Sequence, residues 1–275
     1  MPELPEVETI VGELIENQLV GDTISKMSFS FSKVLQNISE QDLHKKLTHA
    51  KILNIYRRGK WIVFVFKGFI LGFHLRMTGK LWIQNQIKDF HKHERAKFFL
   101  GSKRVLVFED QRKFGRIHYS EEKDPFPKLG MEPFSMTFNA KTLKALFSKS
   151  KRTLKAFLLD QTKIAGLGNI YVDEALFASK LHPQEIVNRL TLKETERLVL
   201  AIQEVLKTGI ENNGTTLGNH RSNYASAKGK GGSNQNRLKV FRKDGKPCLV
   251  CGSLIVKIRV ATRGTHFCPN CQKIK

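Results

Sequence analysis

The first helical pattern lies at the start of the chain. Apolar side chains recur three and four residues apart at Val7, Ile10, Val11, Leu14 and Ile15. The glutamates between them fall on the opposite face, at Glu6, Glu8, Glu13 and Glu16. This spacing is that of an amphipathic helix, and Pro5 suits a first helical turn. The sequence therefore predicts a helix that begins near Pro5 and turns its glutamates to solvent.

Short apolar runs follow, rich in Val, Ile and Phe and separated by turn residues. They predict strands at 51–56, 61–66, 69–75, 80–83, 97–100 and 105–109. Short strands at this spacing are typical of an antiparallel sandwich or barrel. Residues 121–136 contain three prolines and a glycine, which predict a linker.

The second half of the chain changes to helical spacing. We expect helices at 139–149, 153–160, 170–180 and 191–211, the last opened by a Thr191–Glu194 capping box. The whole is therefore an α+β protein, with an N-terminal antiparallel β-sandwich led by a helix, and a helical C-terminal part that ends in a β-hairpin. We place domains at 1–135, 136–236 and 237–275.

Two glycine-containing segments of the helical part can each be interpreted in two ways. Residues 163–171 join two helices through Gly166 and Gly168, and Asn169 can cap the second helix. This turn either binds a phosphate at the helix N-terminus or only connects the helices. Residues 212–236 hold almost no apolar side chains. They form a flexible loop, either a disordered connector or a functional flap.

The only cysteines stand close together near the end of the chain. Cys248, Cys251, Cys268 and Cys271 follow the spacing C-x2-C-x16-C-x2-C. Two such turns complete a tetrahedral thiolate shell with no open position, so we expect one structural zinc ion and no organic cofactor. Two disulfides or a redox pair are the alternatives. Between the cysteine pairs, residues 254–260 read as a strand that returns through 263–267.

Charge narrows the class of partner. Lys and Arg number 47 against 25 Asp and Glu, a net charge of +22. From Arg221 onward there are 13 basic residues and one acidic residue, Asp244. Such a field attracts the phosphate backbone of nucleic acids. A ribosome-bound or merely basic protein is the alternative. Arg263, at the tip of the expected hairpin, is either a phosphate contact or a solvated side chain.

Other features set the cellular context. With 275 residues, of which 40% are hydrophobic, the chain can bury a core of ordinary size. Its apolar runs are shorter than the ~20 residues of a membrane span, and its acidic start is unlike a secretory signal. We therefore expect a cytoplasmic protein.

Three segments, in order, resemble the formamidopyrimidine-DNA glycosylases. They are the opening Pro2–Glu8, the double turn Gly166–Tyr171, and the end Arg263–Gln272. The resemblance covers the whole chain. It implies a base-excision repair enzyme that removes oxidised purines, such as 8-oxoguanine and formamidopyrimidines, and then cuts the strand at the abasic site. It also implies a nucleoid-associated monomer of bacterial type whose partner is double-stranded DNA with an oxidised base or an abasic site.

The resemblance also implies a catalytic set. The amine of Pro2 matches the nucleophile, which requires removal of Met1. Glu3 matches the proton donor that activates the sugar, Lys60 the lysine of β-elimination, and Arg263 the arginine of δ-elimination. An α-amino group has a pKa of roughly 7.7–8.0, and we expect the positive end of the first helix to disfavour its protonated form further.

Further residues match DNA contacts of the family. The DNA-binding set is His74, His93, Arg112, Lys151 and Asn169. The side chains that fill the gap left by the flipped base are Met77, Arg112 and Phe114. A lesion pocket is expected from Glu6, Lys155, Glu174, Thr215 and Tyr224. The chain departs from the family pattern at 212–216 and in the loop 217–236, which in the family covers the flipped base.

Two rival functions remain at this point. Endonuclease VIII, which acts on oxidised pyrimidines, shares the nucleophile, the double turn and the zinc finger. The Leu4–Val7 opening and the Met77, Arg112 and Phe114 set favour the purine enzyme. A non-catalytic zinc-ribbon DNA-binding protein explains the charge and the cysteines, but it gives no reason for Pro2, Glu3 or Lys60.

Overall fold

Two separate sets of contacts organise the chain. The computed structural model describes residues 1–122, 124–218, 224 and 226–275. One unit comprises Met1–Pro127 with Ile210–Gln235, and the other comprises Lys128–Gly209 with Asn236–Lys275. The described part of Ile210–Gln235, which the sequence analysis placed with the helical domain, thus belongs to the first unit. The expected loop and linker residues 123, 219–223 and 225 lie outside the described residues.

The first unit is built on two sheets. Its strands are β1 Ile24–Phe29, β2 Leu35–Gln36, β3 Asn54–Arg58, β4 Trp61–Phe66, β5 Phe69–His74, β6 Gly79–Gln84, β7 Glu94–Leu100, β8 Val105–Asp110 and β9 Arg116–Ser120. One sheet has the order β1-β7-β8-β6 and the other β2-β9-β5-β4-β3. The short β2–β9 pair is parallel, and the other pairs in these two sheets are antiparallel. The predicted antiparallel sandwich is confirmed.

Aromatic side chains join the two sheets. The ring of Phe73 on β5 lies 5.6 Å from that of Phe98 on β7 and 6.0 Å from that of Phe108 on β8, centroid to centroid. All three residues are buried. Edge-on aromatic packing of this kind adds to the free energy of apolar burial. The core of the first unit therefore lies between the sheets.

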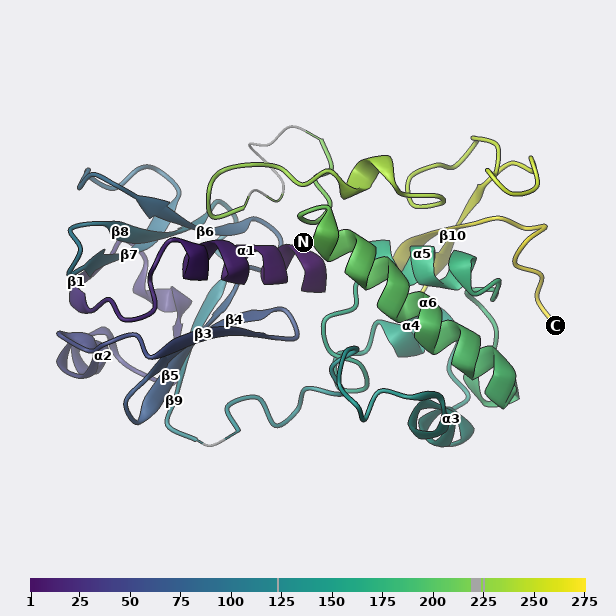
Figure 1. Cartoon of the computed structure of the whole chain (residues 1–275), viewed down its shortest axis with the longest axis horizontal. Coiled ribbons are helices and arrows are strands. Elements are labelled where there is room, and N and C mark those ends of the chain that lie inside the picture. Colours follow the sequence, from purple (N-terminus) through teal and green to yellow (C-terminus); the bar gives the residue numbers. More distant parts are fainter. Residues whose placement is uncertain (123, 219–223, 225) are drawn as a thin grey trace. The chain divides into compact units, whose positions relative to one another are not determined.

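Helix α1, Leu4–Glu16, covers the β3–β4 part of the second sheet (Figure 1). The predicted buried stripe is present, except that Ile15 is 44% exposed. The expectation for Glu6 is wrong, because this side chain is buried rather than turned to solvent. Its oxygens accept the N–H groups of Glu3 and Thr215, each at 2.7 Å, and such donors offset the desolvation of a carboxylate.

Several elements of the first unit were not predicted. They include β1, β2, β9 and helix α2, Glu40–Leu47. Only Leu43 and Leu47 of α2 are buried, so its apolar period is too sparse to recognise. β1 mixes buried, half-buried and exposed positions without strict alternation. The strand expected from residue 51 begins at Asn54.

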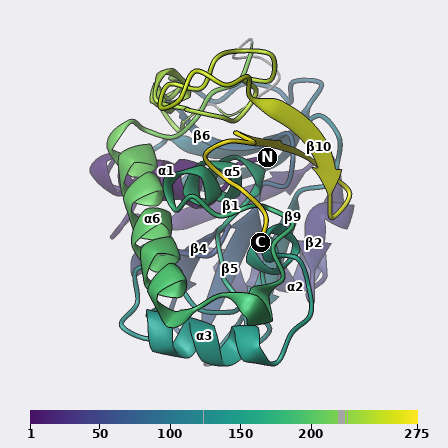
Figure 2. The ribbon, with the colours of Figure 1, turned by 90° about the vertical axis from the view of Figure 1, so that its right-hand side faces the viewer.

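The second unit holds helices and a hairpin (Figure 2). The elements are α3 Ala140–Ser148, α4 Leu154–Leu158, α5 Asn169–Ala178, α6 Leu192–Glu211, β10 Val256–Val260 and β11 Arg263–Phe267. The last two residues of α6, Ile210 and Glu211, belong to the first unit. The capping box is present, because Thr191 N–H donates to Glu194 and Glu194 N–H donates to Thr191 Oγ1.

The segment after α6 makes specific contacts with α1 where it is described. Lys228 donates from its backbone N–H to Glu13 at 2.9 Å and from its ammonium to Glu16 at 2.6 Å. Thr215 and Thr216 are buried. No helix within the described part of the chain is long and apolar enough to cross a membrane.

Candidate active site and nucleic-acid interface

Pro2 and Glu3 stand at the N-terminus of α1. Both are buried, whereas Met1 is exposed. Glu3 is the residue before the first helical turn, and its N–H donates to Glu6 Oε2. The amides of this turn carry partial positive charge. With Met1 attached, Pro2 N is a tertiary amide; once Met1 is removed it becomes an amine next to a carboxyl group.

Lys60 lies in the tight turn between β3 and β4. Arg58 pairs with Trp61, which leaves a two-residue loop of Gly59 and Lys60. Gly59 has φ +57°, a left-handed conformation that glycine adopts without steric cost. Lys60 is only 6% exposed. The turn therefore fixes the backbone from which the ammonium group extends.

His74, at the end of β5, is held as a neutral imidazole. Its ring meets that of Trp61 edge-on at 4.8 Å. Burial lowers the pKa of His74 to about 3, and the positive charges of Arg76 and Lys60 contribute in the same direction. Its Nδ1 accepts the N–H of Arg76 at 3.1 Å, which assigns the proton to Nε2. His74 can thus donate a hydrogen bond from Nε2, and Lys60 lies close enough to affect it.

The expected gap-filling side chains form one exposed cluster on the first unit. Met77 and Phe114 are each 48% exposed. The Arg112 guanidinium lies 4.7 Å above the Phe114 ring, and its Nη1 is 3.1 Å from Met77 Sδ. An apolar wedge beside an arginine suits insertion into a base stack. Half-buried His93 precedes β7, and its carbonyl accepts the N–H of Asp110 at 2.8 Å.

Three of the expected pocket residues also come together in the first unit. Thr215 N–H donates to Glu6 Oε1. Gly214, with φ +78°, passes so close that a Cβ there would lie 2.8 Å from Glu6 Cγ. Tyr224 is buried in the hydrophobic core. Burial, followed by the negative charge of Glu6, raises the pKa of Tyr224, so its phenol is neutral beside this carboxylate.

The second unit contains a buried ion pair between α4 and α5. Lys155 and Asp173 are both fully buried, with 2.5 Å between Nζ and Oδ1. Asp173 Oδ2 accepts the N–H of His266 on β11 at 2.9 Å. The carbonyl of Gly264 accepts from Lys155 at 3.2 Å and from the Asn169 amide at 3.0 Å. These bonds hold the start of β11, and with it Arg263, next to the first turn of α5.

Glu174, one residue further on α5, anchors another segment. Its carboxylate accepts the backbone N–H groups of Lys239, Val240 and Phe241 at 2.8–2.9 Å. Lys155 and Glu174, both expected at a lesion pocket, thus engage their charged groups inside the second unit. Their observed contacts position the hairpin and the 239–241 segment. Lys151 is exposed just before α4.

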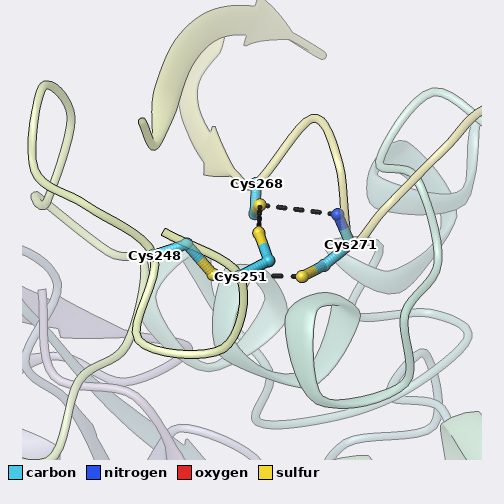
Figure 3. A group of neighbouring side chains, drawn as sticks. All are labelled: Cys248, Cys251, Cys268 and Cys271. Atoms are coloured by element: carbon cyan, nitrogen blue, oxygen red, sulfur yellow. Dashed lines mark hydrogen bonds between the residues drawn. The ribbon is translucent and has the colours of Figure 1, made fainter. Parts of the chain in front are cut away.

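The four cysteines gather at the hairpin of the second unit (Figure 3). Their sulfur atoms all lie within 4.8 Å of one another. The Cys248–Cys271 and Cys251–Cys268 sulfurs are 3.9 and 3.4 Å apart. Four thiolates about 2.3 Å from a zinc ion at tetrahedral angles lie roughly 3.8 Å from each other, whereas disulfide sulfurs are bonded at about 2.05 Å. The residues fit one structural zinc ion.

Comparison with known proteins identifies the family. Residues 1–117 match the formamidopyrimidine-DNA glycosylase N-terminal domain, residues 129–220 the H2TH domain of these enzymes, and residues 245–274 a zinc finger found in FPG and IleRS. The chain belongs to the formamidopyrimidine-DNA glycosylases. The glycosylase of Mycoplasma genitalium is 40% identical over 100% of this chain and 96% of its own, and that of Protochlamydia amoebophila is 41% identical over 99% and 100%.

Solved structures of this family have the same fold. A Lactococcus lactis Fpg, in complex with DNA containing an oxidised pyrimidine, has 37% sequence identity and a TM-score of 0.90 over 99% of this chain and 100% of its own. A second L. lactis Fpg structure, with DNA containing an abasic site, has 36% identity and the same TM-score, over 98% and 99% of the two chains. The chain is accordingly a base-excision repair DNA glycosylase for oxidised purines, with abasic-site lyase activity and a structural zinc finger.

Sequence reasoning missed two carboxylates that organise these sites. Asp110 and Asp173 are both fully buried. Asp110 directly follows a predicted strand and precedes the loop that ends at Gly115, a position where Asp often holds a turn. Asp173 stands beside Glu174 in α5, a helix with apolar residues on every side. A charged residue within such a pattern is the only sequence signal of its role.

Proposed function

We propose that Pro2, once Met1 is removed, is the nucleophile of base excision and that Glu3 is its acid. The amine attacks C1′ of the damaged nucleotide, and the bond from C1′ to the base breaks. The amine proton passes to the departing base, and Glu3 delivers a second proton to the ring oxygen. The sugar ring then opens and leaves a Schiff base (an iminium) between Pro2 N and C1′. The position of Glu3 next to Pro2, at the positive end of α1, supports this assignment.

Lys60 and Arg263 complete the proposed catalytic set, in β- and δ-elimination. The fixed turn that carries Lys60, and its electrostatic effect on His74, support a site for a phosphate group. Neutral His74 donates to such a phosphate from Nε2. Asn169 and exposed Lys151 contact the backbone from the second unit, and half-buried His93 contacts it from the first.

Met77, Arg112 and Phe114 fill the space of the extruded base in this proposal. Their joint exposure and mutual contacts support it. Glu6, Thr215 and Tyr224 form part of the lesion pocket, supported by the hydrogen bonds that join Glu6 to Thr215. In this proposal Lys155 and Glu174 position the hairpin and the 239–241 segment of the second unit. We further infer a monomer in the cytoplasm, associated with the nucleoid.

The decisive experiment is borohydride trapping on a duplex with one 8-oxoguanine opposite cytosine. Protein without Met1 should form a covalent adduct, and peptide mapping should place it on Pro2. Glu3→Gln should release base at least 100-fold more slowly, since general acid–base groups contribute about 10²–10⁴-fold. Glu40→Gln, in the first turn of α2, is the matched control and should retain the wild-type rate.

Three results would contradict the proposal. One is an adduct on another residue, the second is the same rate for Glu3→Gln and Glu40→Gln, and the third is no adduct from processed wild-type protein. A parallel duplex with an oxidised pyrimidine is needed, because an L. lactis relative was solved with such DNA. Faster excision from that duplex would favour the pyrimidine lesion as the main substrate.

A further inference from the structure

Asp110 joins three segments of the first unit that carry expected DNA contacts. It is the last residue of β8, is fully buried, and pairs with Gly79 of β6. Its Oδ1 accepts from Thr78 Oγ1 at 2.5 Å and from Arg112 N–H at 3.1 Å. Its Oδ2 accepts from Gly115 N–H at 2.7 Å. One carboxylate therefore binds both ends of the loop that presents Arg112 and Phe114, and also the residue after Met77.

The backbone of Asp110 reaches the third segment. Its N–H donates to the carbonyl of His93 at 2.8 Å, and its carbonyl accepts from Arg95 Nε at 2.8 Å. Arg95 is itself buried and also donates to the carbonyl of Lys92 at 3.1 Å. The segment that carries His93 is thus tied to the same residue that holds the gap-filling loop.

The loop held by Asp110 has a conformation that needs such support. Lys113, at its centre, has φ +60°, which is unfavourable for a residue with a side chain. A Cβ at Gly115 would lie 2.5 Å from the Phe108 ring, so the chain passes tightly over the core here. Met77 and Phe114 are half exposed and gain little free energy from packing. The carboxylate of Asp110 holds both ends of this loop, and Arg116 donates to the carbonyl of Lys113 at its centre, at 3.1 Å.

We propose that Asp110 is the positioning residue of the wedge, setting Met77, Arg112 and Phe114 in their inserting geometry before DNA binds. The inference rests on the proposed gap-filling role of those three side chains. A wedge already in place avoids ordering a loop during insertion, which would otherwise slow extrusion of the base. Asp110 itself touches no DNA in this proposal and acts through the loop.

Asp110→Asn is the sharpest variant, because it keeps size and shape. A side-chain amide offers one acceptor oxygen instead of two, so in either orientation Gly115 N–H or the Thr78 hydroxyl loses its carboxylate acceptor. In the second case Arg112 N–H keeps only Thr78 Oγ1, at 3.2 Å. We expect amide hydrogen exchange at 112–115 to accelerate at least 10-fold in protein without DNA. Excision of 8-oxoguanine under single-turnover conditions should slow at least 10-fold. Cleavage at a preformed abasic site, where no base is extruded, should slow less than 3-fold.

Asp22→Asn is the matched control. Asp22 is another carboxylate of the first unit whose Oδ1 accepts two backbone N–H groups, those of Thr23 at 2.8 Å and Ser102 at 3.2 Å. Asp22 lies just before β1 and holds the turn between β7 and β8 through Ser102. Asp22→Asn should therefore leave both rates unchanged. A second test combines Asp110→Asn with Phe114→Ala. If Asp110 acts through the wedge, the double variant should excise within 3-fold of Phe114→Ala alone.

The outcomes separate this inference from the proposed function. Wild-type protein that neither excises 8-oxoguanine nor cleaves at the abasic site would refute the proposed function. Active wild type with unchanged exchange at 112–115 in Asp110→Asn would overturn the inference alone. Equal slowing of excision and abasic-site cleavage, or multiplicative effects in the double variant, would do the same, because either result means a role outside the wedge.

Discussion

Replacing Lys155 by Met tests whether this residue is structural. Lys155→Met keeps most of the side-chain volume but leaves the Asp173 carboxylate buried with no cation at 2.5 Å. Removal of one partner from a fully buried ion pair costs about 3–5 kcal/mol. With a urea dependence of about 2 kcal/mol per molar, that loss lowers the unfolding midpoint by roughly 1.5–2.5 M. The Gly264 carbonyl also loses one donor, so Arg263 should be less well held.

The chain offers a built-in way to locate the effect. Its only tryptophans, Trp61 and Trp82, belong to the first unit, whereas the four zinc-binding cysteines belong to the second. Zinc release, followed with a chromophoric indicator during urea unfolding, therefore reports the second unit. Tryptophan fluorescence reports the first. Lys155→Met should release zinc at a urea concentration roughly 1.5–2.5 M lower than wild type does.

A double variant completes the test. Lys155→Met with Asp173→Leu removes both charges, but the His266 N–H then lacks its acceptor, which costs about 1–3 kcal/mol. The double variant should thus be more stable than Lys155→Met alone. Unchanged zinc release in Lys155→Met, together with lost excision, would refute the reasoning, because that pattern is expected of a lysine that contacts the lesion.

Three further predictions concern single features of the two units. The His74 pKa of about 3 lies below its unfolded value near 6.5, so the stability it contributes is complete above pH 6.5 and falls as the pH drops toward 3. Between pH 7 and pH 5, wild type should lose about 2 kcal/mol more unfolding free energy than His74→Gln; equal losses in urea titrations would argue against a buried neutral ring. Cys271→Ala should reduce bound zinc below one per chain and weaken duplex binding, measured by metal analysis and fluorescence anisotropy; full zinc occupancy would contradict a four-thiolate site. Ala261 and Thr262 form the β10–β11 turn with φ +49° and +62°, so an Asn-Gly replacement should stabilise the second unit by about 1–2 kcal/mol, seen as later zinc release on heating; earlier release would contradict the assigned strain.

The sequence predicted those helices and strands whose apolar residues recur at a regular spacing. The α1 stripe, most core strands and the helices of the second unit have apolar residues at regular spacing, and each was found within a few residues of its expected position. The cysteine spacing predicted the zinc site for the same kind of reason, since two C-x2-C turns specify a local geometry. β1 and α2 were missed because each buries few side chains in a regular pattern.

Buried charge is what periodicity could not predict. A pattern method places every glutamate or lysine at the surface, and by that rule Glu6 belonged outside. Its burial depends on N–H donors from Glu3 and from Thr215, which lies 209 residues further along the chain. No local window contains that partner. The same holds for Lys155, whose acceptor Gly264 is 109 residues away.

These long-range polar contacts explain why the site residues were easier to name than to place. Arg263 and Asn169 were recognised from their motifs, but their relative position is set by the Gly264 carbonyl, and by the Lys155–Asp173 pair behind it. A buried pair contributes little net stability compared with apolar packing, yet it leaves few alternative arrangements because each unpaired charge is costly. We therefore expect substitutions at Lys155 and Asp173 to alter how the hairpin presents Arg263 even where the chain still folds.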